Sequence, residues 1–293
     1  MGPLLAHIGS KLGEAVGRRV NLHAAREVGG GCINRTYQAS DGKQNWFVKV
    51  NDANRADLFA AEAEGLRALA QGPLRVPRVM CQGEALGRSF LVLEWLEVGA
   101  GVPADYAKLG EQLACLHALT GPQHGWGCDN YIGSTPQTNT VNASWPRFFA
   151  RARLAPQLAL ARSNGHNGLT ARGEKLVEAL PRLFGAHAPQ PSLLHGDLWS
   201  GNTAFLADGI PVVFDPAVYY GDREADLAMT ELFGGFAQDF YAAYHAHSAL
   251  DPGYRVRKAL YQLYHVLNHA NLFGGAYAAQ AQAVIGRLLS EAR

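Results

Sequence analysis

The spacing of apolar positions divides the chain into a strand-rich first third and a helix-rich remainder. Short apolar runs rich in β-branched and aromatic residues predict strands over 24–28, 35–39, 46–50 and 90–95. Apolar residues that recur every three to four positions predict helices over 56–70, 106–119, 145–161, 170–183, 224–246 and 254–270. A short β-patch over 193–215 lies among the later helices.

This order of elements predicts an α+β fold of two lobes. A β-rich N-lobe is expected over residues 1–97 and a mainly helical C-lobe over 98–293. The boundary is placed near 97–102, where glycines interrupt both periodicities. A ligand is expected in the cleft between the lobes, because pockets concentrate at such interfaces.

Composition narrows the class of protein. With 48% hydrophobic and 17% charged residues, the chain is typical of a globular protein. A net charge of +1 gives no electrostatic reason to expect nucleic acid or a membrane surface as partner. No window approaches the roughly 18 apolar residues of a membrane span, and residues 1–20 have helical spacing rather than that of a signal peptide. The four cysteines form neither a CxxC pair nor a zinc pattern, so a reducing cytoplasm is expected.

The residues with the clearest chemistry lie in the β-patch. Asp197 is followed five positions later by Asn202, and Asp215 comes thirteen positions after that, directly behind an apolar strand. In a kinase catalytic loop, an aspartate with this spacing accepts the proton of the attacking hydroxyl, while the asparagine and the second aspartate hold the metal ion. The set therefore predicts phosphoryl transfer from ATP, with Asp197 as the base and with Asn202 and Asp215 as Mg²⁺ ligands.

Three consecutive glycines separate the first two predicted strands: Gly29, Gly30 and Gly31. Consecutive glycines let backbone N–H groups approach phosphate oxygens, although a flexible hairpin turn has the same sequence. Cys32 follows directly, where nearby amides would favour its thiolate. The hypothesis of redox control at Cys32, through oxidation or a disulfide between two copies, stands beside the simpler one of a small residue in a tight turn.

Lys49 is the only charged residue in its predicted strand. It is either the solvent-facing member of that strand or the lysine that binds the α- and β-phosphates of ATP with a glutamate partner from the next helix. Glu62 and Glu64 are both available there, and Glu62 is preferred because it shares a helical stripe with core leucines. At the end of the 90–95 strand, Glu94 and Leu96 are the candidates for binding the adenine edge.

Three further residues are candidates for the acceptor side. Trp199, between Asp197 and Asn202, is either packed in the core or a platform for the apolar face of a sugar. His269 and Asn271 precede a glycine pair and are candidates for a polar substrate wall. His265 and Asn268 could belong to the same wall, or they could equally be interior polar groups whose hydrogen bonds are satisfied.

Several segments resemble the fructosamine kinase (ketosamine-3-kinase) family: 131–137, 153–160, 195–202, 214–224, 232–236 and 267–275. The resemblance implies a protein-kinase-like two-lobed fold, ATP and Mg²⁺ as cofactors, and phosphorylation of a sugar hydroxyl on a ketosamine or glycated protein. It also implies a role in deglycation, since phosphorylation at O3 makes the adduct labile. One departure is Asp222, where many relatives carry histidine.

Two alternatives stay open beside this prediction. One is a small-molecule kinase for another acceptor, such as an aminoglycoside, choline or homoserine. The other is a nucleotide-binding pseudokinase that acts as a regulator, but such proteins typically lose part of the catalytic set that is complete here. A monomer or a redox-linked homodimer is expected.

Overall fold

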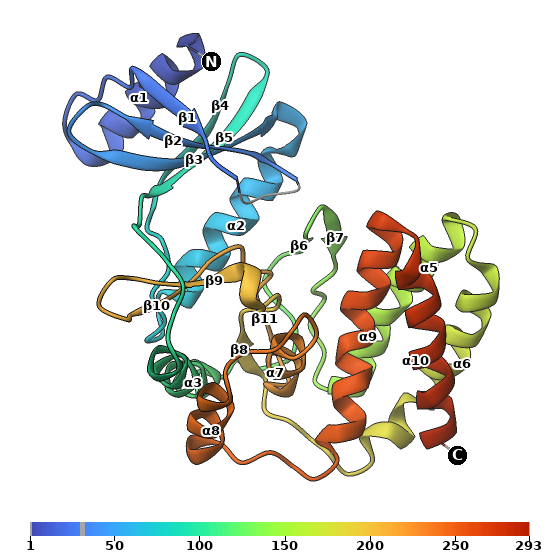
Figure 1. The fold of residues 1–293 in the computed structure, drawn as a ribbon. Coiled ribbons are helices and arrows are strands. Elements are labelled where there is room, and N and C mark those ends of the chain that lie inside the picture. The colour runs from blue at the N-terminus through green and yellow to red at the C-terminus, as the bar shows by residue number, and fades with distance from the viewer. Residues whose placement is uncertain (1, 30–32, 293) are drawn as a thin grey trace.

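The computed structural model describes residues 2–29 and 33–292, which form a sheet-containing lobe and a larger helical lobe (Figure 1). The predicted α+β, two-lobed fold is confirmed. The chain leaves the sheet at Glu94 and enters the first helix of the second lobe at Pro103, so the connection has irregular structure over the predicted boundary region.

The N-lobe is built on a five-stranded antiparallel sheet in the order β1-β2-β3-β5-β4. Its strands are β1 (Ala24–Glu27), β2 (Arg35–Ser40), β3 (Asn45–Asp52), β4 (Val79–Ala85) and β5 (Arg88–Glu94). Helix α1 (Gly2–Val16) packs on β4 and β5, and α2 (Ala56–Leu69) packs on the same two strands. The two helices pack in separate apolar clusters. Helix α1 belongs to a cluster that contains Ile8 and Trp46, and α2 belongs to one that contains Phe59 and Leu91.

Strand β4 was not predicted, for a physical reason. It is an edge strand whose side chains are nearly all half-buried, so its sequence lacks the alternation that identifies a strand with one buried face.

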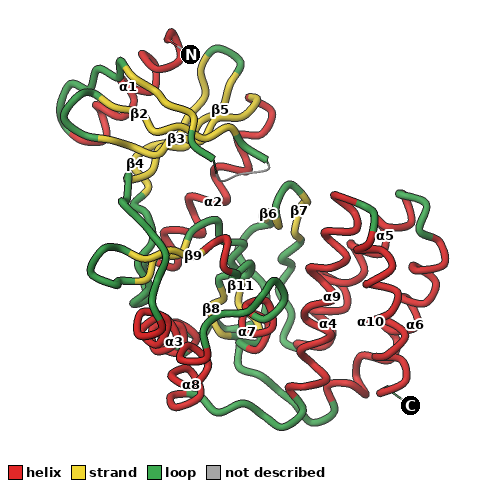
Figure 2. The backbone as a smooth tube through the Cα atoms, in the orientation of Figure 1, coloured by secondary structure: helices red, strands yellow, loops and turns green. Residues whose placement is uncertain are grey.

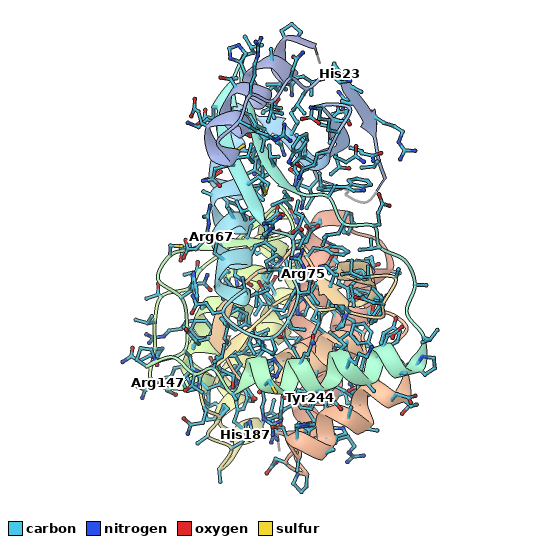
Figure 3. All side chains as sticks on the ribbon, turned by 90° about the vertical axis from the view of Figure 1, so that its left-hand side faces the viewer. His23, Arg67, Arg75, Arg147, His187 and Tyr244 are labelled. Atoms are coloured by element: carbon cyan, nitrogen blue, oxygen red, sulfur yellow. The ribbon has the colours of Figure 1, made fainter. Side chains whose placement is uncertain are left out.

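The segment that precedes β4 connects the two lobes. Arg75 accepts a backbone hydrogen bond from Val213 of the C-lobe (3.0 Å) and donates from its side chain to Glu94 (2.6 Å), and it lies near the middle of the view in Figure 3.

Most of the C-lobe is helical. Helices α5, α6, α9 and α10 form a bundle on the right-hand side of the view in Figures 1 and 2. The helices are α3 (Pro103–His117), α4 (Trp145–Phe148), α5 (Ala155–Ser163), α6 (Asn167–Phe184), α9 (Tyr254–Phe273) and α10 (Ala276–Glu291). A π-helical segment (Phe149–Leu154) joins α4 to α5. Helix α10 was not predicted, although Ala281, Ile285 and Leu288 are buried at helical spacing. None of the helices within 2–29 and 33–292 is both long and apolar enough to span a membrane.

Short strands at the centre of the C-lobe position its loops. They pair antiparallel as β6 (Asn130–Ile132) with β7 (Thr135–Gln137), β8 (Ser192–Leu194) with β11 (Tyr219–Gly221), and β9 (Thr203–Phe205) with β10 (Pro211–Val213). A short 3-10 turn (Ser200–Asn202) precedes β9. The loop from β8 to this turn carries Asp197, and the loop from β10 to β11 carries Asp215, so both aspartates emerge from the same small β-patch.

The helix predicted over 224–246 is wrong as a single element. The structure has α7 (Glu224–Thr230), a loop, and α8 (Gln238–His247). In the loop, Gly234 and Gly235 have φ angles of 92° and 78°, which place both residues outside the helical region. The apolar residues of this loop imitate helical spacing, but α7 ends at Thr230, and the positive φ angles of the glycine pair keep the helix from resuming before α8. The Phe233 ring lies against Trp199, with 5.6 Å between the ring centroids.

Candidate active site

A buried carboxylate holds the start of the loop that carries Asp197. Asp226, on α7, is 1% exposed and accepts hydrogen bonds from the backbone N–H groups of His195 and Gly196, both at 2.8 Å. The Nδ1 atom of His195 accepts from the Asp197 N–H (3.2 Å), and Nε2 donates to the Phe214 carbonyl (3.1 Å). Burial lowers the pKa of His195, so a neutral imidazole braces the loop.

Gly196 permits the tight turn before Asp197. Its φ is 82°, and a Cβ atom on this residue would lie 2.1 Å from the carbonyl oxygen of Ala217. The two loops are also joined by a hydrogen bond from the Ala217 N–H to the His195 carbonyl, at 2.9 Å. Any other residue at 196 would separate the two loops that carry Asp197 and Asp215.

Asn202 lies against Asp197, as the spacing of the two residues predicts. Its Nδ2 donates to the backbone carbonyl of Asp197 (2.9 Å) and to Oδ2 of the same residue (3.2 Å). Its Oδ1 accepts no hydrogen bond from any residue that the structure describes and remains available to a ligand. Burial, reinforced by the negative charge of Asp215, raises the pKa of Asp197 to about 7, although the Asn202 hydrogen bond opposes this shift.

Asp215 has a φ of 55°, an uncommon conformation for a residue with a side chain. Aspartate is among the few residues that tolerate it, because its short polar side chain bonds locally. Such strain often marks functional positions. Here the conformation leaves the carboxylate 38% exposed at the junction of the lobes, where it accepts a hydrogen bond from Lys49.

Lys49 is buried on β3 and faces the C-lobe. Its Nζ lies 2.7 Å from Oε1 of Glu62 and also contacts Oδ1 of Asp215. Burial disfavours the charge of Lys49, but Asp215 and Glu62 outweigh this effect and raise the pKa above its ordinary value. Glu64, the alternative partner, is exposed and accepts instead from Trp126 at 2.8 Å.

Two cavities meet at this ion pair. The sheet-side cavity, of about 470 Å³, lies beneath the N-lobe sheet and is lined by residues that include Val28, Phe47, Leu93 and Val212. The helix-side cavity, of about 770 Å³, opens towards α9 and is lined by residues that include Asp197, Trp199, His265 and His269. They share five lining residues: Ile33, Asn34, Lys49, Gly201 and Asp215. Two ligands could therefore approach each other across Lys49 and Asp215.

Gly29, Glu94 and Leu96 all line the sheet-side cavity. The Glu94 carboxylate is bound by Arg75 (2.6 Å) and lies 3.3 Å from Arg78. The backbone groups of Leu96 form no hydrogen bond with the described residues, which leaves them free for a polar ligand edge. Gly30, Gly31 and Cys32 lie outside the described residues.

Trp199 lies on the wall of the helix-side cavity and is not part of the buried core clusters. Its ring packs on Gly201, where an added Cβ would come within 2.3 Å of ring atoms, and meets the Phe233 ring edge-on at 5.6 Å. His269 lines the same cavity and lies 4.9 Å from Phe233. An aromatic wall therefore stands beside Asp197.

Asn271 does not line the helix-side cavity, in contrast to the prediction. Its side chain donates to the backbone carbonyl of Gln157 (2.9 Å) and to Oε1 of that residue (2.8 Å). Asn268 lies on the cavity wall instead, because it is one helical turn from His265 on the inner face of α9, whereas Asn271 faces α5.

Sequence reasoning missed Asp226 at this site and left the role of His265 open. Asp226 lies within an acidic run after the 214–224 segment, and only tertiary structure shows that its carboxylate binds the loop backbone. His265 was considered either an interior polar group or part of a substrate wall; it lines the helix-side cavity, and its Nδ1 lies 3.7 Å from Oδ1 of Asp197. Because His265 lies on the buried stripe of α9, its sequence position did not show that it is close to Asp197.

Asp222 has a structural explanation. Its Oδ1 accepts from the Glu224 N–H (3.0 Å) at the start of α7, and its Oδ2 contacts the Tyr261 hydroxyl and Nε2 of His187 (2.7 Å). Neighbouring Arg223 turns away and donates to Tyr244. His187 and Tyr244 lie low in the C-lobe in Figure 3, away from the junction of the lobes, so Asp222 organises the base of α7 and does not form part of the cavities.

Comparison with known proteins identifies the family. The sequence profile of the fructosamine kinases matches residues 4–291. A probable ketoamine kinase of Synechocystis sp. is 49% identical over 96% of both chains. A chloroplastic protein-ribulosamine 3-kinase of Oryza sativa subsp. indica is 39% identical over 92% of this chain and 80% of its own.

Solved structures agree in fold. A crystal structure from Haemophilus somnus, described as a fructosamine-3-kinase, has a TM-score of 0.89 and 32% identity over 96% of both chains. An aminoglycoside phosphotransferase solved with hygromycin B has a TM-score of 0.61 at 19% identity, covering 97% of this chain and 98% of its own, and shares the fold. The resemblance drawn from the motifs is confirmed: the chain belongs to the fructosamine kinase family.

Proposed function

We propose that the protein is an ATP-dependent kinase that phosphorylates a sugar hydroxyl of a ketosamine, either a small glycated amine or a glycated protein. The observation that carries this proposal is the pair of adjoining cavities with Lys49 and Asp215 at their junction and Asp197 beside it. A role in deglycation within the cytoplasm belongs to the same proposal, as does the division into an N-lobe over 1–97 and a C-lobe over 98–293.

In this proposal the sheet-side cavity binds ATP. Lys49, oriented by Glu62, contacts the non-transferred phosphates, and Leu96 presents free backbone groups to the adenine edge. Glu94 holds the end of β5 in place through its ion pairs with Arg75 and Arg78. Gly29 lines this cavity, and in the proposal Gly29, Gly30 and Gly31 offer backbone N–H groups to the phosphates.

The helix-side cavity then binds the acceptor, and Asp197 accepts the proton of its hydroxyl. A pKa of about 7 suits a general base at neutral pH, because the carboxylate is both substantially ionised and basic enough to take a proton. Trp199 and His269 would form the wall against which the sugar lies. The protein supplies position and charge rather than a covalent intermediate.

The residues present fit a Mg²⁺ ion. Magnesium prefers oxygen ligands, and both the Oδ1 of Asn202 and the partly exposed carboxylate of Asp215 offer such atoms next to the junction of the cavities. Bound there, the ion would neutralise developing charge on the phosphates. Asn202 would hold it on the Asp197 side, and Asp215 would hold it on the Lys49 side.

The test is ATP consumption by the purified protein against a panel of ketosamines, aminoglycosides and choline. Turnover with ketosamines and little with the other acceptors is expected. An aminoglycoside is a polycation, yet the carboxylates among the described residues that line the helix-side cavity are Glu62, Asp197 and Asp215, all of which the proposal assigns to phosphoryl transfer. Preferential turnover of aminoglycosides or choline would contradict the proposed acceptor, and ATP binding without turnover of any acceptor would favour a pseudokinase.

Asp215→Asn should weaken Mg-dependent nucleotide binding, because one negatively charged oxygen ligand is lost. The affinity for Mg–ATP should fall by more than about tenfold, because the loss of a residue that only supports a metal ligand already costs about 10- to 100-fold. Binding titrations with and without Mg²⁺ check this. An equal loss of affinity in both conditions would contradict the assignment of Asp215 to the metal.

Trp199→Ala should raise the KM for the acceptor and leave the KM for ATP nearly unchanged, because the indole lines the helix-side cavity alone. An increase of about tenfold is expected for the loss of one aromatic platform. Steady-state kinetics with each substrate varied in turn, together with thermal melts, check this. A loss of thermal stability with both KM values unchanged would instead show that the indole serves only packing.

A further inference from the structure

His265 is placed close to the proposed base without bonding to it. It lies on α9, is 5% exposed, and lines the helix-side cavity. Its Nδ1 lies 3.7 Å from Oδ1 of Asp197, which is longer than a hydrogen bond between nitrogen and oxygen. The two side chains therefore point into the same part of the cavity as separate polar groups.

The ring nitrogens of His265 form no hydrogen bond with any residue in the described part of the chain. Neither nitrogen is among the fully enclosed side-chain atoms that lack a partner, so both are open to the helix-side cavity and available to a ligand that enters it. Nearby Asn268 provides a contrast, because it accepts from Gln157 (3.1 Å) and donates to the carbonyl of Ile132 (3.3 Å).

The ring is also in a defined chemical state. Burial, aided by His269, lowers the pKa of His265 to about 3, so the imidazole is neutral at physiological pH. A neutral imidazole carries one N–H donor and one lone pair. It can therefore bond to a hydroxyl group, which both donates and accepts, without competing with Asp197 as a charged partner.

We propose that His265 binds the hydroxyl next to the one that Asp197 activates, so that the site selects acceptors with two hydroxyl groups on neighbouring carbons. Two side-chain atoms 3.7 Å apart can each bond to one oxygen of such a diol, which fixes the sugar by two contacts and presents one hydroxyl for transfer. This inference rests on the proposed kinase function and adds a specificity-determining residue to it.

The experiment compares wild type, His265→Leu and His265→Asn on a parent ketosamine and on two deoxy analogues, each lacking the hydroxyl on one side of the phosphorylated carbon. Leucine fills the site without polar atoms, whereas asparagine retains a donor and an acceptor near the position of Nδ1. For wild type, one of the two analogues should lose about 10- to 100-fold in kcat/KM, as expected when a buried polar partner is left unpaired.

His265→Leu should lose a similar factor on the parent acceptor but little more on that analogue, because the contact is already absent. His265→Asn should recover much of the activity, and the KM for ATP should be unchanged in both variants. His247→Leu, which replaces an exposed histidine on α8, is the matched control and should behave as wild type.

Two results would overturn the inference, and they are distinguishable. If wild type turns over the parent ketosamine but His265→Leu loses the same factor on the parent and on both analogues, the histidine does not bind a neighbouring hydroxyl. If wild type fails to phosphorylate the parent ketosamine at all, the proposed function fails, and the assignment of His265 fails with it.

Discussion

Asp197→Asn should reduce kcat by about 10²–10⁴-fold, the usual contribution of a positioned general base. The asparagine cannot take the acceptor proton, but its carbonyl oxygen can still accept the hydrogen bond that Asn202 now donates at 3.2 Å. The loop should therefore keep its shape. Because Asp197 lines the helix-side cavity and not the sheet-side one, the affinity for ATP should change little. Single-turnover kinetics and nucleotide titrations measure the two quantities separately.

A matched control for this substitution is Asp208→Asn, which removes the same charge from the exposed turn between β9 and β10. It should retain wild-type turnover, so that a loss in Asp197→Asn cannot be attributed to net charge. Near-normal kcat in Asp197→Asn would remove Asp197 as the base. Loss of ATP affinity in parallel with turnover would instead indicate that the loop had collapsed.

The fold was largely predictable because most elements carry a clear period. The strands that became β1, β2, β3 and β5 and the helices α2, α3, α6 and α9 were located within a few residues. The errors have local causes. The edge strand β4 has no alternation of burial, and the apolar residues around the Gly234–Gly235 pair continue a helical period that their backbone angles forbid.

The local part of the candidate site could likewise be expected from sequence. Asp197 and Asn202 are near neighbours in the chain, and the structure brings them into hydrogen-bonding distance. The pairing of Lys49 with Glu62 follows from the stripe of α2 that faces the sheet. Contacts between distant segments could not be predicted in this way. The hydrophobic period of α9 shows which of its residues are buried but not which of them face the 195–202 loop. The positions of His265 and Asn271 are of this kind.

Asp226→Asn should destabilise the protein and also disturb catalysis. The Asp226 carboxylate accepts from His195 and Gly196 and also contacts Nε2 of His117 at 3.1 Å, so it has donors around both oxygens. Burial alone would raise its pKa, but these hydrogen bonds and the nearby histidines hold the pKa below its ordinary value. An asparagine would turn an NH₂ group towards one of these donors. Breaking a buried charged network of this kind costs about 3–5 kcal/mol.

Two measurements separate Asp226 from an ordinary core residue. Unfolding in denaturant should give the loss of stability, and kinetics on the fraction that remains folded should show a lower kcat with little change in either KM, because Asp226 lines neither cavity but supports the backbone on which Asp197 is mounted. The matched control is Asp239→Asn, an exposed aspartate in the first turn of α8, which should leave stability and kcat close to wild type. A folded Asp226→Asn protein with normal kcat would show that the loop keeps its geometry without the carboxylate. Its bonds to His195 and Gly196 would then contribute to stability alone.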